Sequence, residues 1–285
     1  MTPDGIQMEI LVTLDEAYIP YLNVMLSSLL HSNPDQRFRV WLLHTSVRDA
    51  AVEETRRILG ARSQLVMIPA WDIGIDDAPV SGRYPREMYY RIFAARYLPK
   101  TLDRVLYLDP DIVILGDVSE LYHLPLDGYY FAAASHVGRF LNSVNSARLD
   151  MAEESPYINS GVLLMNLALL RLEQDFGQVF TFIDSHRHAL LLPDQDVISS
   201  LYGEKILALD PLRYNMTERL FAKAALTGKP LALDWVRENT VILHYCGRNK
   251  PWKETYHGSL DVFWREAKDK LEKESDKNET MDKKV

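Results

Sequence analysis

The sequence predicts an α/β fold in which helices cover a parallel β-sheet. Short runs of apolar and β-branched residues alternate with longer segments whose apolar residues recur every three or four positions. This alternation is typical of strands that are each followed by an amphipathic helix, and such units build parallel sheets. Several of the apolar runs also end in acidic or other polar residues, at the sheet edge where α/β proteins bind ligands.

The first part of the chain repeats this unit. We expect strands at residues 10–14, 38–43 and 65–68, and helices at 19–31 and 47–59. Each helix has one apolar face and is followed by residues that stop helices. The order strand, helix, strand, helix, strand therefore predicts one continuous parallel sheet.

The middle and the end of the chain are less regular. Residues 71–85 are rich in Gly, Asp and Pro and predict a loop, and residues 136–155 are polar and predict a mobile loop. Beyond residue 209 the pattern is weak. The other expected elements are a helix at 87–97, a strand at 104–108 that continues extended through 112–114, strands at 129–134, 157–165 and 241–243, and a mostly helical segment at 167–186.

Composition argues against some classes of protein. The chain is 47% hydrophobic and 25% charged, as in an ordinary soluble protein, and its net charge of -8 argues against a nucleic-acid partner. Cys246 is the single cysteine, so no internal disulfide forms and a reducing compartment fits. The first residues do not resemble a secretory signal, and the most apolar run, 161–170, is too short to span a bilayer. We expect a cytoplasmic protein.

The last part of the chain, residues 259–285, differs from the body at 1–258. Phe263, Ala267 and Leu271 are spaced as on one helix face, so a helix is expected to begin there. After Leu271 few residues are left to bury, which predicts disorder. Acidic and basic residues balance in this segment, so we expect at most weak, transient contact with a membrane.

Two acidic residues follow the strand at 104–108, in the triplet Asp109-Pro110-Asp111. Positions two apart in extended chain face the same way, and Pro110 fixes the backbone between them. Both carboxylates can therefore serve one site, where oxygen ligands suit a divalent cation. Taken alone, the triplet is also compatible with a solvated turn.

A second polar group follows the strand at 241–243. His244 comes first, Gly247 allows close approach of the backbone, and Lys250 offers a point charge for phosphate. An imidazole added to two carboxylates favours Mn²⁺, with Mg²⁺ as the alternative, and a bound diphosphate would complete the ligand shell. The alternative for His244 alone is a structural histidine.

Six motifs in this order resemble the family 8 retaining glycosyltransferases, which include bacterial lipopolysaccharide galactosyl- and glucosyltransferases and glycogenin. The resemblance covers about residues 8–255 and implies a single catalytic GT-A domain with a mixed, mainly parallel sheet, a UDP-sugar donor, and Mn²⁺ held by Asp109, Asp111 and His244. The motifs are Thr13-Leu14-Asp15-Glu16-Ala17-Tyr18, Tyr90-Arg91, Asp109-Pro110-Asp111, Asn159-Ser160-Gly161, Asp194-Gln195-Asp196 and His244 to Trp252.

The resemblance also implies roles for single residues. The nucleotide-binding half would be about 8–115 and the half for the sugar and acceptor about 116–258. The residues expected to hold the donor are Asp15 and Tyr18 at the uracil and ribose, Arg91, Asp109 and Pro110, and Gly247 and Lys250 at the diphosphate. The residues expected around the transferred sugar are Asn159, Asp194 and Gln195.

Each of these assignments has a structural alternative. Tyr18 is also expected to pack in the first turn of its helix, and Arg91 to form a surface salt bridge. The acidic residues around Gln195 are also suited to capping a helix that begins at Val197.

Two positions depart from the family pattern. Ala17 stands where many members have a polar residue that contacts the ribose. His136 falls near an acidic residue of the lipopolysaccharide galactosyltransferases. The resemblance therefore leaves glucose and galactose both open as the transferred sugar, and the acceptor is expected to be a glycan or glycolipid hydroxyl.

The resemblance implies transfer with retention. A carboxylate nucleophile would form a covalent intermediate, but the matching residue is Gln195, whose amide is a poor nucleophile. Attack from the same face as the leaving group is therefore favoured, while Asp194 keeps a double displacement open.

Two other functions use similar residues. A sugar-nucleotide nucleotidyltransferase would have a glycine-rich, basic loop after the first strand, whereas residues 14–17 are acidic and lack glycine. A non-catalytic sugar-nucleotide-binding protein would carry the same site, and turnover with an acceptor or with water distinguishes it from an enzyme. The oligomeric state is not indicated by the sequence.

Overall fold

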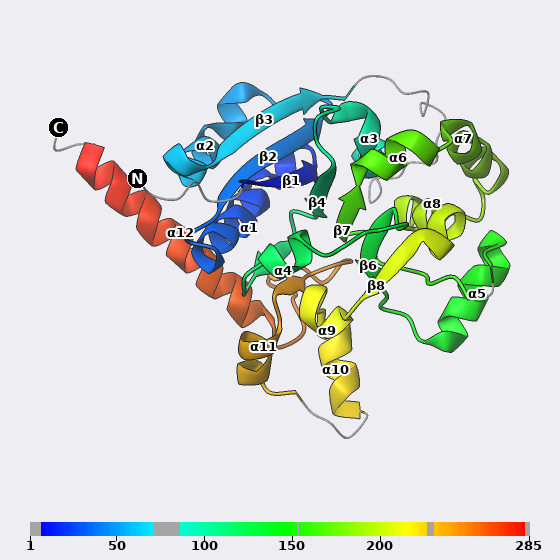
Figure 1. The fold of residues 1–285 in the computed structure, drawn as a ribbon. Coiled ribbons are helices and arrows are strands. Elements are labelled where there is room, and N and C mark those ends of the chain that lie inside the picture. Colours follow the sequence, from blue (N-terminus) through cyan, green and yellow to red (C-terminus); the bar gives the residue numbers. More distant parts are fainter. Residues whose placement is uncertain (1–6, 71–85, 153, 227–230, 283–285) are drawn as a thin grey trace.

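The computed structural model describes residues 7–70, 86–152, 154–226 and 231–282 (Figure 1). The loop expected at 71–85 lies outside these residues. Within them, a seven-stranded sheet has the order β3-β2-β1-β4-β7-β6-β8. Its strands are β1 (Gln7–Thr13), β2 (Arg37–His44), β3 (Gln64–Pro69), β4 (Arg104–Leu108), β6 (Phe131–Ala134), β7 (Val162–Asn166) and β8 (Ile206–Leu209).

The sheet is mixed and mainly parallel, as predicted. Strands β1 to β4 are mutually parallel, β7 runs antiparallel to β4 and β6, and β8 is parallel to β6. Both faces are covered. In β1, Ile10 and Val12 pack toward helix α1, whereas Leu11 packs toward Trp41 on the other face. Burial on both faces explains why β1 is almost continuously apolar.

Helices lie on both faces of the sheet (Figure 1). One face packs against α1 (Ile19–Ser32), α2 (Glu53–Leu59) and α4 (Ser119–Tyr122). The other packs against a 3₁₀ segment at Arg86–Phe93 and against α3 (Ala94–Tyr97), α6 (Leu167–Glu173), α7 (Phe176–Ser185) and α8 (Pro193–Tyr202). The helix expected at 87–97 is therefore mostly 3₁₀, and the segment at 167–186 is two helices.

The polar segment at 136–155 is not a loop throughout, because it contains helix α5 (Arg139–Leu149). Phe140 and Val144 are exposed on this helix, and Leu149 is its one buried residue. A helix without an apolar stripe toward the core has no periodic pattern to detect. The weakly patterned region after Leu209 likewise holds short helices, α9 (Pro211–Tyr214), α10 (Glu218–Leu226) and α11 (Leu233–Asn239).

A second, two-stranded sheet brings distant segments together. Strand β5 (Ile112–Ile114) pairs antiparallel with β9 (Ile242–His244), and Ile112 lies opposite His244. His244, expected to follow a strand at 241–243, is instead the last residue of β9. It reaches the same region through this small sheet, which begins immediately after Asp111.

Helix α12 (Asp261–Asp282) runs alongside α1 (Figure 1). Its first turns bury Phe263 and Trp264 against Val113 and Leu243. Disorder was expected after Leu271, and the structure describes this helix through Asp282. Beyond Leu271, Glu274 pairs with His31 and Ser275 donates to Glu54. Among the described residues, no helix is both long and apolar enough to cross a membrane.

Candidate functional site

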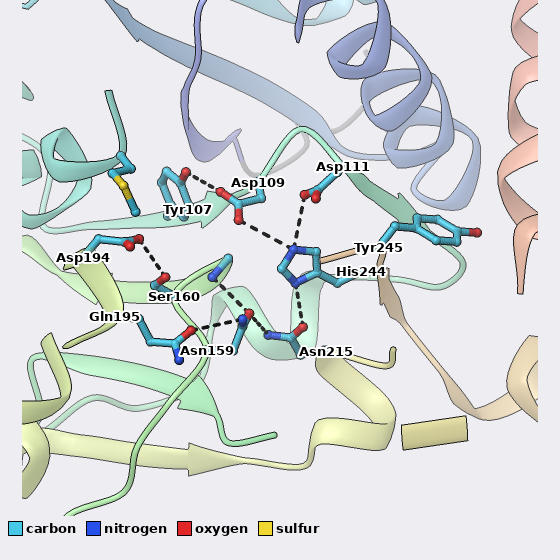
Figure 2. A network of polar contacts seen from close by, with 12 residues as sticks. Tyr107, Asp109, Asp111, Asn159, Ser160, Asp194, Gln195, Asn215, His244 and Tyr245 are labelled. Atoms are coloured by element: carbon cyan, nitrogen blue, oxygen red, sulfur yellow. Dashed lines mark hydrogen bonds and ion pairs between the residues drawn. The ribbon is translucent and has the colours of Figure 1, made fainter. Parts of the chain in front are cut away.

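The pairing of β5 with β9 assembles a cluster of potential metal ligands (Figure 2). One ligand atom from each of Asp109, Asp111 and His244 lies within 4.8 Å of the others. The Nε2 atom of His244 is 3.6 Å from Asp109 Oδ2 and 3.2 Å from Asp111 Oδ1. The residues predicted from two separate motifs therefore meet at one point, and Asp111 is buried rather than part of a solvated turn.

The surroundings of His244 fit a divalent cation. The imidazole is buried, and its Nδ1 atom lies 2.9 Å from Asn215 Oδ1. The Nε2 atom is also buried and has no hydrogen-bond partner within the described parts of the chain. A nitrogen lone pair facing two carboxylates is costly unless a proton or a cation lies between them, and one imidazole with two carboxylates suits Mn²⁺.

Lys250 lies at the same cluster. Its Nζ atom forms an ion pair with Asp111 and donates to the carbonyl of Tyr245 at 3.0 Å. Burial would raise the pKa of Asp111, but Lys250 and His244 outweigh it and hold that pKa well below its usual value. Burial would lower the pKa of Lys250, but Asp111 outweighs it and the lysine pKa is raised. The lysine is therefore a fixed positive charge beside the metal ligands.

The loop between His244 and Lys250 is shaped by Gly247, whose φ of 86° lies in the left-handed region. Only glycine adopts this conformation without strain, and it leaves the backbone open to close approach. On the far side, Trp252 stacks on Tyr21 with ring centroids 3.8 Å apart. This stack and the contact of Lys250 with the Trp252 ring hold the loop against helix α1.

Arg91 is buried, so the expected alternative of a surface salt bridge is wrong. Its guanidinium lies 3.1 Å from Asp109 and 3.1 Å from Asp194, and it donates to the carbonyl of Ser160 at 3.0 Å. It also lies 4.3 Å from the centre of the Tyr107 ring. Arg91 thus connects Asp109, a potential metal ligand, with the residues expected around the sugar.

The residues expected around the sugar come from the segment just before β7 and from the first turn of α8 (Figure 2). Asp194 is buried and accepts a hydrogen bond from Ser160 Oγ at 2.7 Å. Burial raises the pKa of Asp194 although Arg91 opposes the shift. Gln195 Oε1 accepts from Asn159 Nδ2 at 3.3 Å. Asn159, Asp194 and Gln195 therefore lie together, as predicted.

Asp196 holds the segment that leads into α8, and the N-cap of this helix has no side-chain hydrogen bond, so the expected capping alternative is not seen. Its carboxylate accepts from the backbone N–H groups of Leu191 and Leu192 at 2.7 and 3.1 Å, just before α8 begins. It also pairs with Arg148 and accepts from the Tyr157 hydroxyl at 2.6 Å. The helix begins at Pro193, four residues before the expected start.

The residues expected at the nucleotide lie at the start of α1. Asp15 accepts from the backbone N–H of Ala17 at 3.0 Å and so caps a 3₁₀ turn at Glu16–Tyr18. Tyr18 packs edge-on against Tyr21, which is the expected packing alternative. Burial raises the pKa of Tyr18, and Lys250 opposes the shift. Tyr18 therefore lies close enough to the cluster to sense its charges.

Sequence reasoning did not assign a role in the site to Asn215 or to Gly161. Asn215 lies in the weakly patterned region after Leu209, and a single asparagine there carries no signal. Gly161 belongs to a quoted motif, but its role depends on a close contact with His244. His136 lies beside them and donates from Nε2 to the carbonyl of Asn215 at 2.9 Å.

The chain is similar to known proteins over most of its length. The family model described as "Glycosyl transferase family 8" matches residues 9–256. The chain is 29% identical to a lipopolysaccharide 1,2-glucosyltransferase of Escherichia coli (strain K12), over 84% of this chain and 70% of the relative. It is 27% identical to general stress protein A of Bacillus subtilis (strain 168), over 90% and 92% of the two chains.

A solved structure shares the fold. The galactosyltransferase LgtC, crystallised with donor and acceptor sugar analogues, superposes with a TM-score of 0.78 over 93% of this chain and 96% of that chain, at 23% identity. This likeness concerns the fold, whereas the family match rests on the sequence of most of the chain. The protein therefore belongs to glycosyl transferase family 8 and is a glycosyltransferase.

Proposed function

We propose that this glycosyltransferase moves glucose or galactose from a UDP-sugar to a hydroxyl of a glycan or glycolipid, with retention and with Mn²⁺ at Asp109, Asp111 and His244. Mg²⁺ is the alternative ion. The observation that carries the proposal is the unpartnered, buried Nε2 of His244 facing two carboxylates. A lysine charge beside that cluster suits a diphosphate.

The donor would lie across the start of α1 and the cluster. Asp15 and Tyr18 would contact the uracil and ribose, while Gly247 lets the backbone approach the diphosphate. A bound divalent cation would supply Lewis-acid stabilisation of the departing diphosphate. Lys250 would partly give up its ion pair with Asp111 and stabilise the charge that develops on UDP. Pro110 keeps Asp109 and Asp111 in fixed relation.

Transfer from the same face is favoured by the environment of Asp194. This carboxylate is held by Arg91 and by Ser160 and is buried, so it is a poor candidate for direct attack on a sugar. Gln195 carries an amide, which is a poor nucleophile. Asn159 and Gln195 would position the acceptor hydroxyl beside the anomeric carbon, and the leaving phosphate would take its proton.

The donor site is tested by thermal stabilisation. Melting temperatures would be measured with UDP-, GDP- and ADP-sugars, each with and without Mn²⁺, on wild type and Asp111→Ala. A ligand that binds only the folded state raises the melting temperature. We expect a rise with UDP-sugars alone that requires Mn²⁺ and is absent in the variant. No rise with any nucleotide would reject the proposed donor.

Turnover separates the enzyme from a non-catalytic binding protein. Release of UDP would be followed with UDP-glucose and UDP-galactose, first with water and then with a panel of glycan and glycolipid acceptors. We expect slow hydrolysis that is exceeded by transfer to one acceptor class. Intact-mass spectrometry during turnover tests the same-face route, and a hexose adduct on Asp194 or Gln195 would contradict it.

We also propose a cytoplasmic enzyme whose contact with membranes is at most weak and peripheral. The aromatic residues Phe263 and Trp264 pack in the core, so they are not free to enter a bilayer. Positive and negative charges are mixed along the exposed part of α12, which weakens attraction to anionic lipid. Quantitative co-sedimentation with vesicles of anionic phospholipid would contradict this part of the proposal.

A further inference from the structure

We propose that Asn215 is a positioning residue that selects the metal-binding tautomer of His244 and links this ligand to Gln195 through Asn159. The inference rests on the proposed metal site and adds the buried amide of Asn215 to it as a second layer of contacts. Figure 2 shows the chain of contacts from His244 through Asn215 and Asn159 to Gln195.

The direction of each hydrogen bond in this chain follows from one backbone group. The N–H of Gly161 donates to the side-chain oxygen of Asn159 at 3.2 Å, and a backbone N–H can only donate. The oxygen of Asn159 is thereby identified, so its amide nitrogen faces Gln195 Oε1. The group of Asn215 that lies 3.0 Å from the Asn159 oxygen must then be its amide nitrogen.

The same reasoning continues to the histidine. Because the nitrogen of Asn215 faces Asn159, its oxygen faces His244 Nδ1 at 2.9 Å. An amide oxygen only accepts, so Nδ1 carries the proton. With Nδ1 engaged in this way, Nε2 is the ring nitrogen left to face Asp109 and Asp111. The network therefore orients His244 for metal binding through Nε2. The group that accepts from Nδ1 is the amide oxygen of Asn215 rather than a carboxylate.

Asn215 is placed rigidly enough to perform this task. Its side chain is fully buried, and the following residue, Met216, forms a bridge with Leu243 of strand β9. The N–H of Met216 donates to Ile242 at 3.0 Å, and the N–H of His244 donates to Met216 at 2.7 Å. The backbones of Asn215 and His244 are thus held in one register.

The carbonyl of Asn215 is fixed as well, because His136 donates to it from Nε2 at 2.9 Å. The position that resembles an acidic residue in galactosyltransferases therefore supports the asparagine in this chain. Side chain and backbone of Asn215 are both engaged, and a rotation of the amide would break two hydrogen bonds at once.

The experiment compares Mn²⁺ affinity by electron paramagnetic resonance in wild type, Asn215→Leu, Asn215→Asp and Asn159→Asp. Leucine removes the acceptor for Nδ1, and we expect a loss of about 10- to 100-fold in affinity. Aspartate at 215 still accepts from Nδ1, so Mn²⁺ affinity should be rescued to within about 3-fold of wild type or better. It no longer donates to Asn159, so kcat should still fall.

Asn159→Asp is the matched variant further along the chain. It still accepts from Asn215 and Gly161 but no longer donates to Gln195. We expect unchanged Mn²⁺ affinity and a lower kcat. This split between metal affinity and turnover would not arise from a general loss of packing.

The experiment distinguishes a failure of the proposed metal site from a failure of the role assigned to Asn215. If wild type does not bind Mn²⁺, the proposed metal site fails. If wild type binds and Asn215→Leu binds equally well, the role of Asn215 fails. Should the leucine variant not fold, ¹⁵N-histidine resonances of the metal-free wild type decide. A proton on Nδ1 of His244 supports the inference, and an Nδ1 atom without a proton overturns it.

Discussion

Gly161 lies directly against the imidazole of His244. A Cβ atom built on this glycine would overlap Cε1 of the ring and lie 2.6 Å from Asp109 Oδ2. The backbone of Gly161 also accepts from the N–H of Asp109 at 2.8 Å, so it cannot withdraw without disturbing the end of β4. The main chain immediately before β7 therefore forms one wall of the cluster of potential metal ligands.

Replacing Gly161 by alanine is expected to disrupt this cluster. The added methyl group would displace His244 or Asp109, and Mn²⁺ affinity should fall by more than about 10-fold. Titration of Mn²⁺ by electron paramagnetic resonance measures the change. Gly138→Ala is the matched control, because a Cβ at that position meets no atom within 4 Å. Equal affinities of the two variants would contradict the assigned contact.

Asp196 should be important for stability rather than for metal binding. Asp196→Ala leaves Arg148 without its buried partner and frees two backbone N–H groups at the start of α8. Removing one member of a buried ion pair costs about 3–5 kcal/mol. Urea unfolding would measure this loss. Asp184→Ala is the control, since its exposed pair with Arg187 is worth about 0.5 kcal/mol or less.

His136 should make the protein less stable at acidic pH. Burial, and then the charge of His244, lowers the pKa of His136 from 6.5 to about 4. Between these values the unfolded chain binds a proton that the folded chain does not, so stability rises with pH across this window and is lost as pH falls. The loss reaches up to about 3 kcal/mol at the acid end.

The check is the free energy of unfolding between pH 4 and 7.5 for wild type and His136→Gln. The variant should show a flatter profile across the window. His188→Gln, which changes an exposed histidine, serves as the control and should keep the wild-type profile. Identical slopes for wild type and His136→Gln would refute the assignment.

The two ends of helix α12 should differ in importance. Ending the chain after Leu271 removes exposed contacts such as that of Glu274 with His31, and should cost about 1 kcal/mol or less. Ending it after Leu260 also removes Phe263 and Trp264 from the core, where each large side chain is worth about 3–5 kcal/mol. Denaturant unfolding of both truncations tests this, and similar stabilities would contradict it.

Local patterns in the sequence were sufficient for much of the fold. Strands β1, β2 and β3 and helix α1 were predicted because each buries a periodic set of apolar residues. Helix α5 was missed because only Leu149 of that helix is buried. Where burial is sparse, the periodic signal that sequence reasoning uses is absent.

The candidate site was likewise predictable from the sequence only in part. Asp109 and Asp111 are two residues apart after a strand, and His244 and Lys250 share one motif, so the sequence by itself determined that these groups belong to one chemistry. Only the tertiary structure decided how they meet. The register of β5 against β9 sets His244 opposite Ile112, and Arg91 joins Asp109 to Asp194.

The roles of Asn215 and Gly161 depend entirely on the folded chain. Neither residue type predicts a function, because an asparagine and a glycine are ordinary in loops and strand ends. Their importance comes from a hydrogen bond of 2.9 Å to His244 Nδ1 and from a backbone that touches the same ring. Sequence determined which chemical groups the protein carries, and the tertiary structure decided which neighbours orient them, because such contacts join residues that are distant along the chain.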